Sequence, residues 1–293
     1  MAEKDMAEKL LADNNDVFAD IVNTLLFDGR QVVNENNLEN SKDKSFYKAD
    51  GKLHEQERDV FKYVKNSNIK IAMVGFEHQT EAEEYMPLRV IGYDGSSYRS
   101  QLLSDQKEKC PVITMVLYFG LKPWKYGKTI YETIDIQDEW KPFVSDYRIN
   151  VFEIAFLESE VVKKFKSDFR HVADYFVQKR TIHDYIPSDT QLKHVDETLK
   201  LLSLLTGDNR FEDFINDKKA YEGGVSMCDV LDRIEARGEA RGEARGEARG
   251  EARGEVKAYS NMGKTAEEIA QIMNKPVEVI KDIIKSLTPQ PVK

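Results

Sequence analysis

A chain of 293 residues with 41% hydrophobic and 10% aromatic residues has enough apolar side chains to bury a sizeable core, in one large domain or in a core domain with smaller attachments. Its formal net charge of -9 gives no basic footprint of the kind that duplex-binding proteins usually carry, so a nucleic-acid function must rest on a specific site. The two distant cysteines indicate no disulfide framework, and neither a secretion signal nor a run of roughly 18 apolar residues is present, so we expect a cytoplasmic protein without a membrane partner.

The N-terminal third of the chain predicts one helix followed by two strands. Residues 16–27 carry apolar side chains at helical spacing, with Asp16 as the expected N-cap. Residues 30–50 are polar, and the run 34–44 within them predicts a loop. A short strand is expected within 57–64, and the apolar run 69–76 predicts a buried strand.

The middle of the chain alternates helical and strand patterns. Residues 94–103 begin with turn residues and continue as a predicted helix, and 111–119 predict a second buried strand. Residues 150–174 and 192–217 have helical periodicity. The apolar stripe of this region comprises Phe165, Phe169, Val172 and Phe176. This order of elements predicts an α/β core with a helical C-terminal extension.

A four-residue repeat, Ala-Arg-Gly-Glu, extends from Glu235 to Glu255. Like charges recur at the i,i+4 spacing, as in Arg237 and Arg241, and such pairs destabilise a helix. Each glycine adds a cost of roughly 1 kcal/mol relative to alanine. Two interpretations stay open: a charged, net-neutral spacer, or a helix stabilised by self-association, in which Arg and Glu meet between chains.

The C-terminal segment predicts two short helices joined by a tight turn. Thr265 and Glu268 fit a capping box, Asn274 ends the first helix, and Pro276 suits the first turn of the second. This pattern fits a DNA-binding helix-turn-helix, but it also fits a docking or oligomerisation module. The modest positive charge of the segment favours the second interpretation.

Acidic and amide side chains follow the first buried strand and form a candidate site. Glu77 and Gln79 are two residues apart, so on a strand their side chains point to the same face. Asp59 would reach the same point if its strand pairs with the next one through a tight turn at 66–68. Carboxylates hold the hard divalent cations that phosphodiester hydrolysis uses. Acidic residues at solvated strand ends give the same pattern, so spacing alone leaves both interpretations open.

Three stretches resemble the Rpn family of bacterial recombination-promoting nucleases, transposase-like proteins of the PD-(D/E)XK nuclease superfamily. They are E-x-Q-T after the apolar strand, M-P-L-R with G-Y-D-G in 86–95, and P-V-x-x-x-V-L-Y-x-G-x-x-P-W in 111–124. The resemblance covers roughly residues 16–220. It implies a restriction-endonuclease-like mixed-sheet core, a divalent metal (Mg²⁺, with Mn²⁺ or Ca²⁺ as alternatives) and DNA cleavage that promotes recombination.

The resemblance also implies a role for each candidate catalytic residue. Asp59 would be the motif aspartate and Glu77 the second acidic residue, and both would hold the metal. Gln79 stands where the superfamily usually has lysine, which implies weaker or more metal-dependent activity. Asp20 occupies a position in the first helix that is acidic in many superfamily members, with Asp16 as its rival.

Further residues are candidates for phosphate contact or for support of the site. They are Arg89, Tyr93 and Tyr98. An arginine offers a bidentate fork to phosphate. Arg89 would alternatively pair with an acidic neighbour such as Glu83 or Asp94.

These observations lead us to expect a metal-dependent DNA endonuclease whose partners are DNA and, through the C-terminal repeat, a second copy of the chain. A catalytically inactive nuclease-fold interaction protein and a transposase remain alternatives. The expected domains are a nuclease-like domain, the repeat and a small helix-turn-helix-like unit, over 1–225, 226–258 and 259–293.

Overall fold

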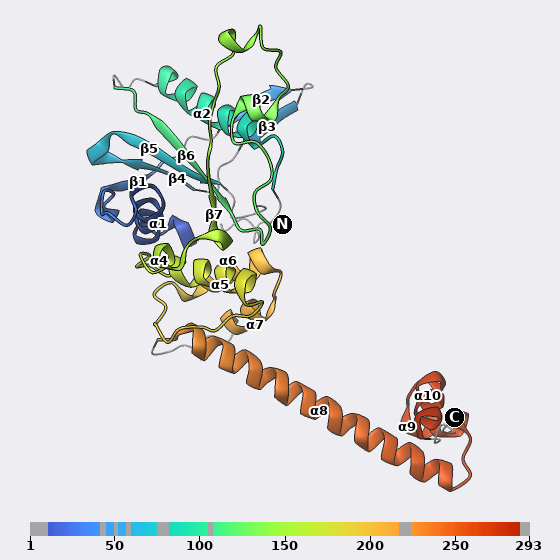
Figure 1. Cartoon of the computed structure of the whole chain (residues 1–293). Helices are drawn as coiled ribbons and strands as arrows, with labels where there is room; N and C mark the ends of the chain where they lie inside the picture. Colours follow the sequence, from blue (N-terminus) through green and yellow to red (C-terminus); the bar gives the residue numbers. More distant parts are fainter. Residues whose placement is uncertain are drawn as a thin grey trace. The chain divides into compact units, whose positions relative to one another are not determined.

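A computed structural model describes residues 11–41, 45–49, 52–56, 60–74, 82–104, 108–216 and 224–287 of the chain (Figure 1). The chain divides into two compact units, Met1–Leu231 and Asp232–Lys293, which we treat one at a time. None of the helices in the described ranges is long and apolar enough to cross a membrane.

Five strands form a mixed sheet in the first unit, in the order β1-β4-β5-β6-β7. Their bounds are Leu38–Asn40 for β1, Val60–Val64 for β4, Ile69–Val74 for β5, Val112–Tyr118 for β6 and Asn150–Glu153 for β7. β4 is antiparallel to β1 and β5, whereas β6 is parallel to β5 and β7. A separate antiparallel hairpin consists of β2 and β3, Ser45–Ala49 and Lys52–Gln56. The predicted α/β class is confirmed.

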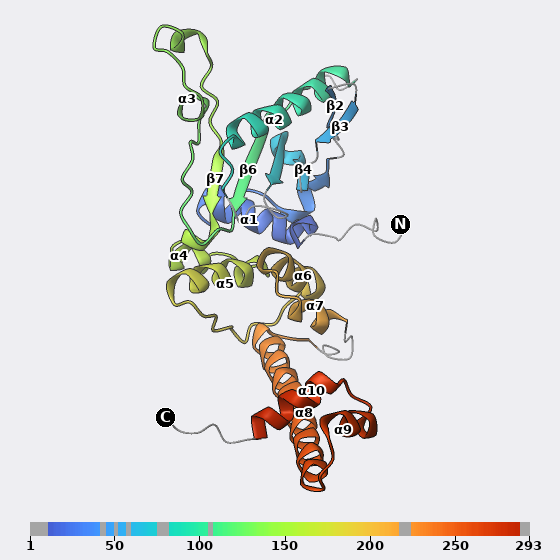
Figure 2. The ribbon, with the colours of Figure 1, turned by 90° about the vertical axis from the view of Figure 1, so that its right-hand side faces the viewer.

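Helices lie on both faces of the sheet, with α2 on one face and α1 on the other (Figures 1 and 2). The helices of the first unit are α1 Asn15–Phe27, α2 Met86–Leu103, α3 Ile130–Thr133, α4 Ser159–Val162, α5 Phe169–Thr181, α6 Val195–Thr206 and α7 Arg210–Ile215. Short 3-10 turns occur at Leu11–Asp13, Glu35–Asn37, Lys65–Ser67, Lys141–Phe143 and Ile154–Phe156.

The predicted pairing of two strands through a tight turn is confirmed for β4 and β5. The turn Lys65–Ser67 is closed by Asn68, whose φ of 48° is left-handed and suits asparagine. Tyr63 Oη donates a hydrogen bond to Asn68 Oδ1 at 3.0 Å. In the resulting register Val60 lies opposite Met73.

The prediction that α2 begins with a turn near Asp94 is wrong. The helix starts at Met86, with Pro87 in its first turn, where the missing N–H has no partner to lose. Asp94 lies in mid-helix, and its carboxylate accepts hydrogen bonds from Thr114 Oγ1 at 2.5 Å and from Tyr147 Oη at 2.5 Å. These partners from distant parts of the chain outweigh the turn preference of an Asp-Gly pair.

Three other predicted boundaries are corrected. The predicted loop 34–44 is not wholly a loop, because β1 lies within it. Residues 150–174 begin with the edge strand β7, which is too short for a clear period, and helical structure follows. α1 is capped by Asn14 rather than Asp16, which leaves the Asp16 carboxylate for contacts elsewhere.

The predicted aromatic stripe is a core of the first unit. Phe165, Phe169 and Phe176 are buried, and Phe119, which follows β6, packs its ring against those of Phe169 and Phe176. This cluster joins the helices after β7 to the end of β6.

The second unit contains α8, Met227–Asn261, from Asp232 onward, and a helical hairpin, α9 Ala266–Met273 and α10 Val277–Leu287. The predicted capping box of Thr265 and Glu268 is present, and Asn274 closes α9 with a φ of 50°. Val256, Ile269, Ala270 and Ile280 form its buried core. The Ala-Arg-Gly-Glu repeat is helical, as the second of the two open interpretations has it.

A buried lysine joins β4, β1 and the start of α1. Lys62 is fully buried, and its ammonium donates hydrogen bonds to the Asp13 carbonyl at 2.8 Å, to Asn15 Oδ1 at 2.8 Å and to Asn40 Oδ1 at 2.7 Å. A charge so far from water is tolerated only where several oxygens surround it. Lys62 therefore ties α1 to the sheet.

Lys62→Met retains the apolar stem but leaves three acceptor oxygens, in part-buried hydrogen bonds with Lys62, without their shared donor. We expect it to lower the free energy of unfolding by about 3 kcal/mol, because each unsatisfied acceptor loses about 1 kcal/mol or more. Urea denaturation of the purified chain measures the change. The matched control is Lys65→Met, which breaks an exposed ion pair with Glu39 and should cost less than about 1 kcal/mol. Equal stability of the two variants would contradict the role of Lys62.

Candidate functional site

The three central residues of the predicted site, Asp59, Glu77 and Gln79, lie outside the described residues. Val60 directly follows Asp59, and Val74 is the last described residue before Glu77; the two valines lie at the same end of the antiparallel pair β4–β5. The register therefore agrees with the sequence argument up to these strand ends. That Asp59 and Glu77 meet beyond them stays a prediction.

A metal site is not formed elsewhere in the described part of the chain. No three His, Cys, Asp or Glu side chains within it gather closely enough to hold a metal ion. The prediction of a metal centre thus depends on Asp59 and Glu77 alone. We refer to the edge of the sheet where β5 and β6 end as the carboxyl edge.

The orientation of α2 brings its N-terminus, the positive end of the helix dipole, to the carboxyl edge. Near its C-terminal end, Gln101 accepts a hydrogen bond from the Cys110 N–H at 2.8 Å, and Tyr98 Oη accepts one from the Val112 N–H at 3.0 Å. α2 therefore runs antiparallel to β6, and its first turn lies beside Tyr118 in one hydrophobic cluster with Met86. The free N–H groups of a helix N-terminus favour negative charge there.

The candidate phosphate ligands Arg89 and Tyr98 have partners within the chain. Arg89 Nε donates to Tyr93 Oη at 2.6 Å, and Nη1 donates to Glu83 Oε2 at 2.8 Å, so the acidic partner is Glu83 rather than Asp94. Burial lowers the pKa of Arg89, but these two hydrogen bonds outweigh it and raise the pKa above its ordinary value. Tyr98 supports the start of β6, at the end opposite the carboxyl edge.

A basic loop borders the carboxyl edge and was missed by the sequence analysis. The strand β6 ends at Tyr118, and a cavity of about 450 Å³ opens beside it. Its walls are Ala82, Tyr118, Leu121, Lys122, Pro123, Lys125 and Tyr126. The residues 119–129 contain lysines and no acidic residue, a signal that the negative charge of the whole chain obscured.

Asp20, the fourth predicted catalytic residue, is buried and holds a distant segment of the chain. Its Oδ2 accepts hydrogen bonds from the Lys166 N–H at 2.8 Å and from the Ser167 N–H at 2.7 Å. It lines a cavity of about 510 Å³ together with Asp16 and Asp168. The geometry gives Asp20 a structural task in joining α1 to the turn before α5.

Asp16, the rival of Asp20, belongs to an ion-pair cluster in the same cavity. Its carboxylate contacts Lys193 Nζ at 2.6 Å and His194 Nε2 at 3.0 Å. Burial raises the pKa of Asp16, but the hydrogen bonds and charges of these two partners outweigh burial and lower the pKa to about 2. The stabilisation from this cluster is therefore present above the ordinary Asp pKa and lost as the pH falls through about 2.

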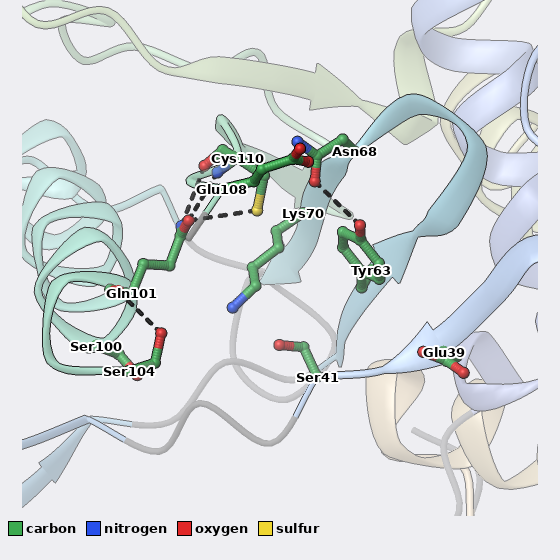
Figure 3. A pocket seen from close by; sticks show the side chains of 10 residues that line it. All are labelled: Glu39, Ser41, Tyr63, Asn68, Lys70, Ser100, Gln101, Ser104, Glu108 and Cys110. Atoms are coloured by element: carbon green, nitrogen blue, oxygen red, sulfur yellow. Dashed lines mark hydrogen bonds between the residues drawn. The ribbon is translucent and has the colours of Figure 1, made fainter. Parts of the chain in front are cut away.

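Another cavity, of about 650 Å³, lies at the opposite edge of the sheet (Figure 3). The Lys70 side chain extends into it, and Tyr63, Asn68, Gln101 and Cys110 are among its walls (Figure 3). The hydrogen bonds of Gln101 with Cys110 and of Tyr63 with Asn68 account for these polar groups within the chain. The cavity is far from the strand ends that lead to Asp59 and Glu77.

A family model described as "Putative transposase, YhgA-like" matches residues 6–205 of the chain. The match covers more than half of the sequence and includes Asp20, Asp59, Glu77 and Gln79 as well as the basic loop. Comparisons with curated proteins and with solved structures gave no match.

The role of Asp20 can be tested by comparing two substitutions. Asp20→Ala leaves two backbone N–H groups without their acceptor and should lower the free energy of unfolding by about 2–4 kcal/mol. Asp20→Asn keeps an acceptor oxygen and should regain much of this loss. Urea denaturation measures both changes. Wild-type stability of the Asp20→Ala protein would contradict the structural role of Asp20.

Proposed function

The chain belongs to this YhgA-like transposase family, and from that premise we propose that it is a metal-dependent endonuclease that cleaves phosphodiester bonds of DNA and promotes recombination. The observation that carries the proposal is the pairing of β4 with β5. Asp59 immediately precedes β4 and Glu77 follows shortly after β5, so the two acidic residues flank the same end of one strand pair in the sequence.

The proposed roles follow from the chemistry of the side chains. Asp59 and Glu77 supply carboxylate oxygens for a divalent cation, Mg²⁺ with Mn²⁺ or Ca²⁺ as alternatives. Such a cation, when bound, activates water and stabilises charge on the phosphate. Gln79 has an amide that orients a water molecule but, unlike a lysine, brings no positive charge.

Gln79 favours a second candidate function, a nuclease-fold protein that binds DNA or another protein without cleaving DNA. The loss of the usual lysine removes a positive charge from the site. A transposase, the other alternative, requires strand transfer in addition to cleavage. Both alternatives share the fold and differ from the first proposal in the products that they form.

A plasmid-nicking assay distinguishes these functions. The full-length protein should nick supercoiled plasmid in Mg²⁺ or Mn²⁺, and Asp59→Ala or Glu77→Ala should slow nicking by at least about a hundredfold, because several kcal/mol of charge stabilisation is lost with the cation. Gln79→Lys should increase the rate. Asp138→Ala, which breaks an exposed ion pair with Lys141, is the matched control and should nick like wild type. If wild type leaves the plasmid as intact as the folded variants do, the protein is not a nuclease.

We further propose that a second copy of the chain binds along the repeat in α8. Residues 238–251 of this helix are all exposed. A Cβ atom added to any glycine from Gly238 to Gly254 would meet nothing within 4 Å in the single chain, although each glycine costs the helix about 1 kcal/mol. Because glycine has no side chain, these positions allow a neighbouring helix to approach closely.

The residue order of the repeat favours a parallel pair. At 100° per residue, each alanine has Glu at about 60–100° on one side and Arg at about 60–100° on the other. The glycines lie on the opposite face, with the same two flanks. A two-fold axis parallel to the helices places the Arg flank of one copy against the Glu flank of the other. An antiparallel pair would instead place like charges together, which is unfavourable.

Cysteine cross-linking tests the parallel arrangement. Gly242→Cys, Gly246→Cys and Gly250→Cys, each made with Cys228→Ser, should give symmetric disulfide dimers at successive positions, because the glycine face meets the partner and equal residues lie at equal heights in a parallel pair. The glycine stripe turns by about 40° per repeat, so the two helices must wind around each other to keep it at the interface. An antiparallel pair permits a symmetric disulfide only at its axis. Analytical ultracentrifugation should show a dimer of the unmodified chain, and a monomer would contradict the proposal.

A further inference from the structure

We propose that the loop Leu121–Tyr126 binds an unpaired segment of a DNA strand, with Lys122 and Lys125 on the phosphates and Tyr126 against a base. This inference rests on the proposed function for the identity of the nucleic acid. It assigns substrate contacts to residues outside the predicted acidic site.

The loop lies at the carboxyl edge, next to the strand that leads to Glu77. β5 and β6 are parallel, Val74 pairs with Val116, and Tyr118 ends β6 beside the cavity of about 450 Å³. The first turn of α2 borders the same cluster through Met86, so a helix N-terminus adds positive potential. A DNA strand bound in this cavity would lie near the end of β5.

The loop is held in place by a buried tryptophan between the two lysines. Trp124 belongs to the hydrophobic cluster of Val74 and Tyr118, and its ring contacts that of Tyr118 edge-on with centroids 5.3 Å apart. The backbone N–H of Trp124 donates to Glu153 Oε2 at 2.8 Å, and Lys128 Nζ contacts Glu153 Oε1 at 3.3 Å. A loop fixed in this way presents its exposed side chains with little loss of conformational freedom on binding.

The two exposed lysines and Tyr126, which packs against the hydrophobic cluster and is partly exposed, have the chemistry of a single-strand site. Lys122 and Lys125 are exposed, and neither forms an ion pair with any residue in the described part of the chain. Lys125 Nζ lies 4.8 Å from the centroid of the Tyr126 ring, which is partly exposed. Lysines along the backbone, together with an aromatic face for a base, are the usual elements of single-strand recognition. A base paired within a duplex cannot offer its face to Tyr126.

Binding is measured by fluorescence anisotropy in EDTA, where no cleavage occurs, with a labelled fifteen-nucleotide thymidine strand and a duplex of the same length. Lys122→Gln with Lys125→Gln should weaken single-strand binding at least tenfold. It should also reduce the slope of log K against log salt by about 1.4, since each lost phosphate contact contributes about 0.7. Tyr126→Leu should weaken single-strand binding about tenfold, leave the salt slope unchanged and hardly affect the duplex.

The matched control is Lys141→Gln with Lys163→Gln, which removes the same charge from exposed positions elsewhere. It should bind like wild type. Wild-type affinity and slope in the Lys122 and Lys125 variant would overturn the inference, as would equal losses for single strand and duplex with Tyr126→Leu. Circular dichroism establishes that each variant is folded. Binding is measured without metal, so the two proposals can fail separately. A protein that binds as expected but does not nick plasmid refutes the nuclease proposal and leaves DNA binding by the loop intact. A protein that nicks plasmid but does not bind as expected refutes the role of the loop and leaves the nuclease proposal intact.

Discussion

The arrangement of the carboxyl edge depends on one buried carboxylate. Asp94 in the middle of α2 accepts hydrogen bonds from Thr114 on β6 and from Tyr147 ahead of β7. A buried carboxylate needs such partners, because an unpaired charge in the core is strongly unfavourable. The three groups therefore fix the position of the helix along the sheet, and with it the place where the helix begins.

This position has consequences at both ends of α2. Gln101 and Tyr98 hold the helix C-terminal part to the start of β6, so the helix N-terminus must lie where β6 ends. Parallel pairing of β5 with β6 brings two strand ends to that same edge. The carboxyl edge thus contains the N-terminus of α2, the basic loop and the end of the strand that leads to Glu77. At the opposite edge, the polar groups at the end of α2 and at the start of β6 form hydrogen bonds with one another.

The strands that lead to the predicted site could be predicted from the sequence, because the pattern of apolar residues in a buried strand depends on burial alone. The runs around Ile71 and Met115 are apolar on both faces, and such runs form central strands whatever their neighbours are. The start of α2 and the strand β7 were not accessible. The Asp-Gly pair at Asp94 has turn preference, and only Thr114 and Tyr147, distant in sequence, make it helical.

The individual roles of charged residues were the least predictable feature, for the same reason. Asp16 and Asp20 are a turn of α1 apart and differ only in what later segments bring to them: a lysine and a histidine in one case, two backbone N–H groups in the other. An acidic residue in a sequence is equally compatible with a cap, an ion pair or a ligand.

In the repeat in α8, helix propensity and i,i+4 charge pairs disfavour a structure that is nevertheless present. Its like-charged i,i+4 pairs and its glycines disfavour a helix in isolation, yet the segment is one continuous helix. Local terms therefore do not account for its stability, and its surface offers no apolar stripe against which its own chain packs between residues 238 and 251. A polar helix of this kind has no apolar face of its own that could stabilise it. Under the proposed self-association, the fixed order of alanine, arginine, glycine and glutamate would give a parallel copy of the helix a matching pattern of charge.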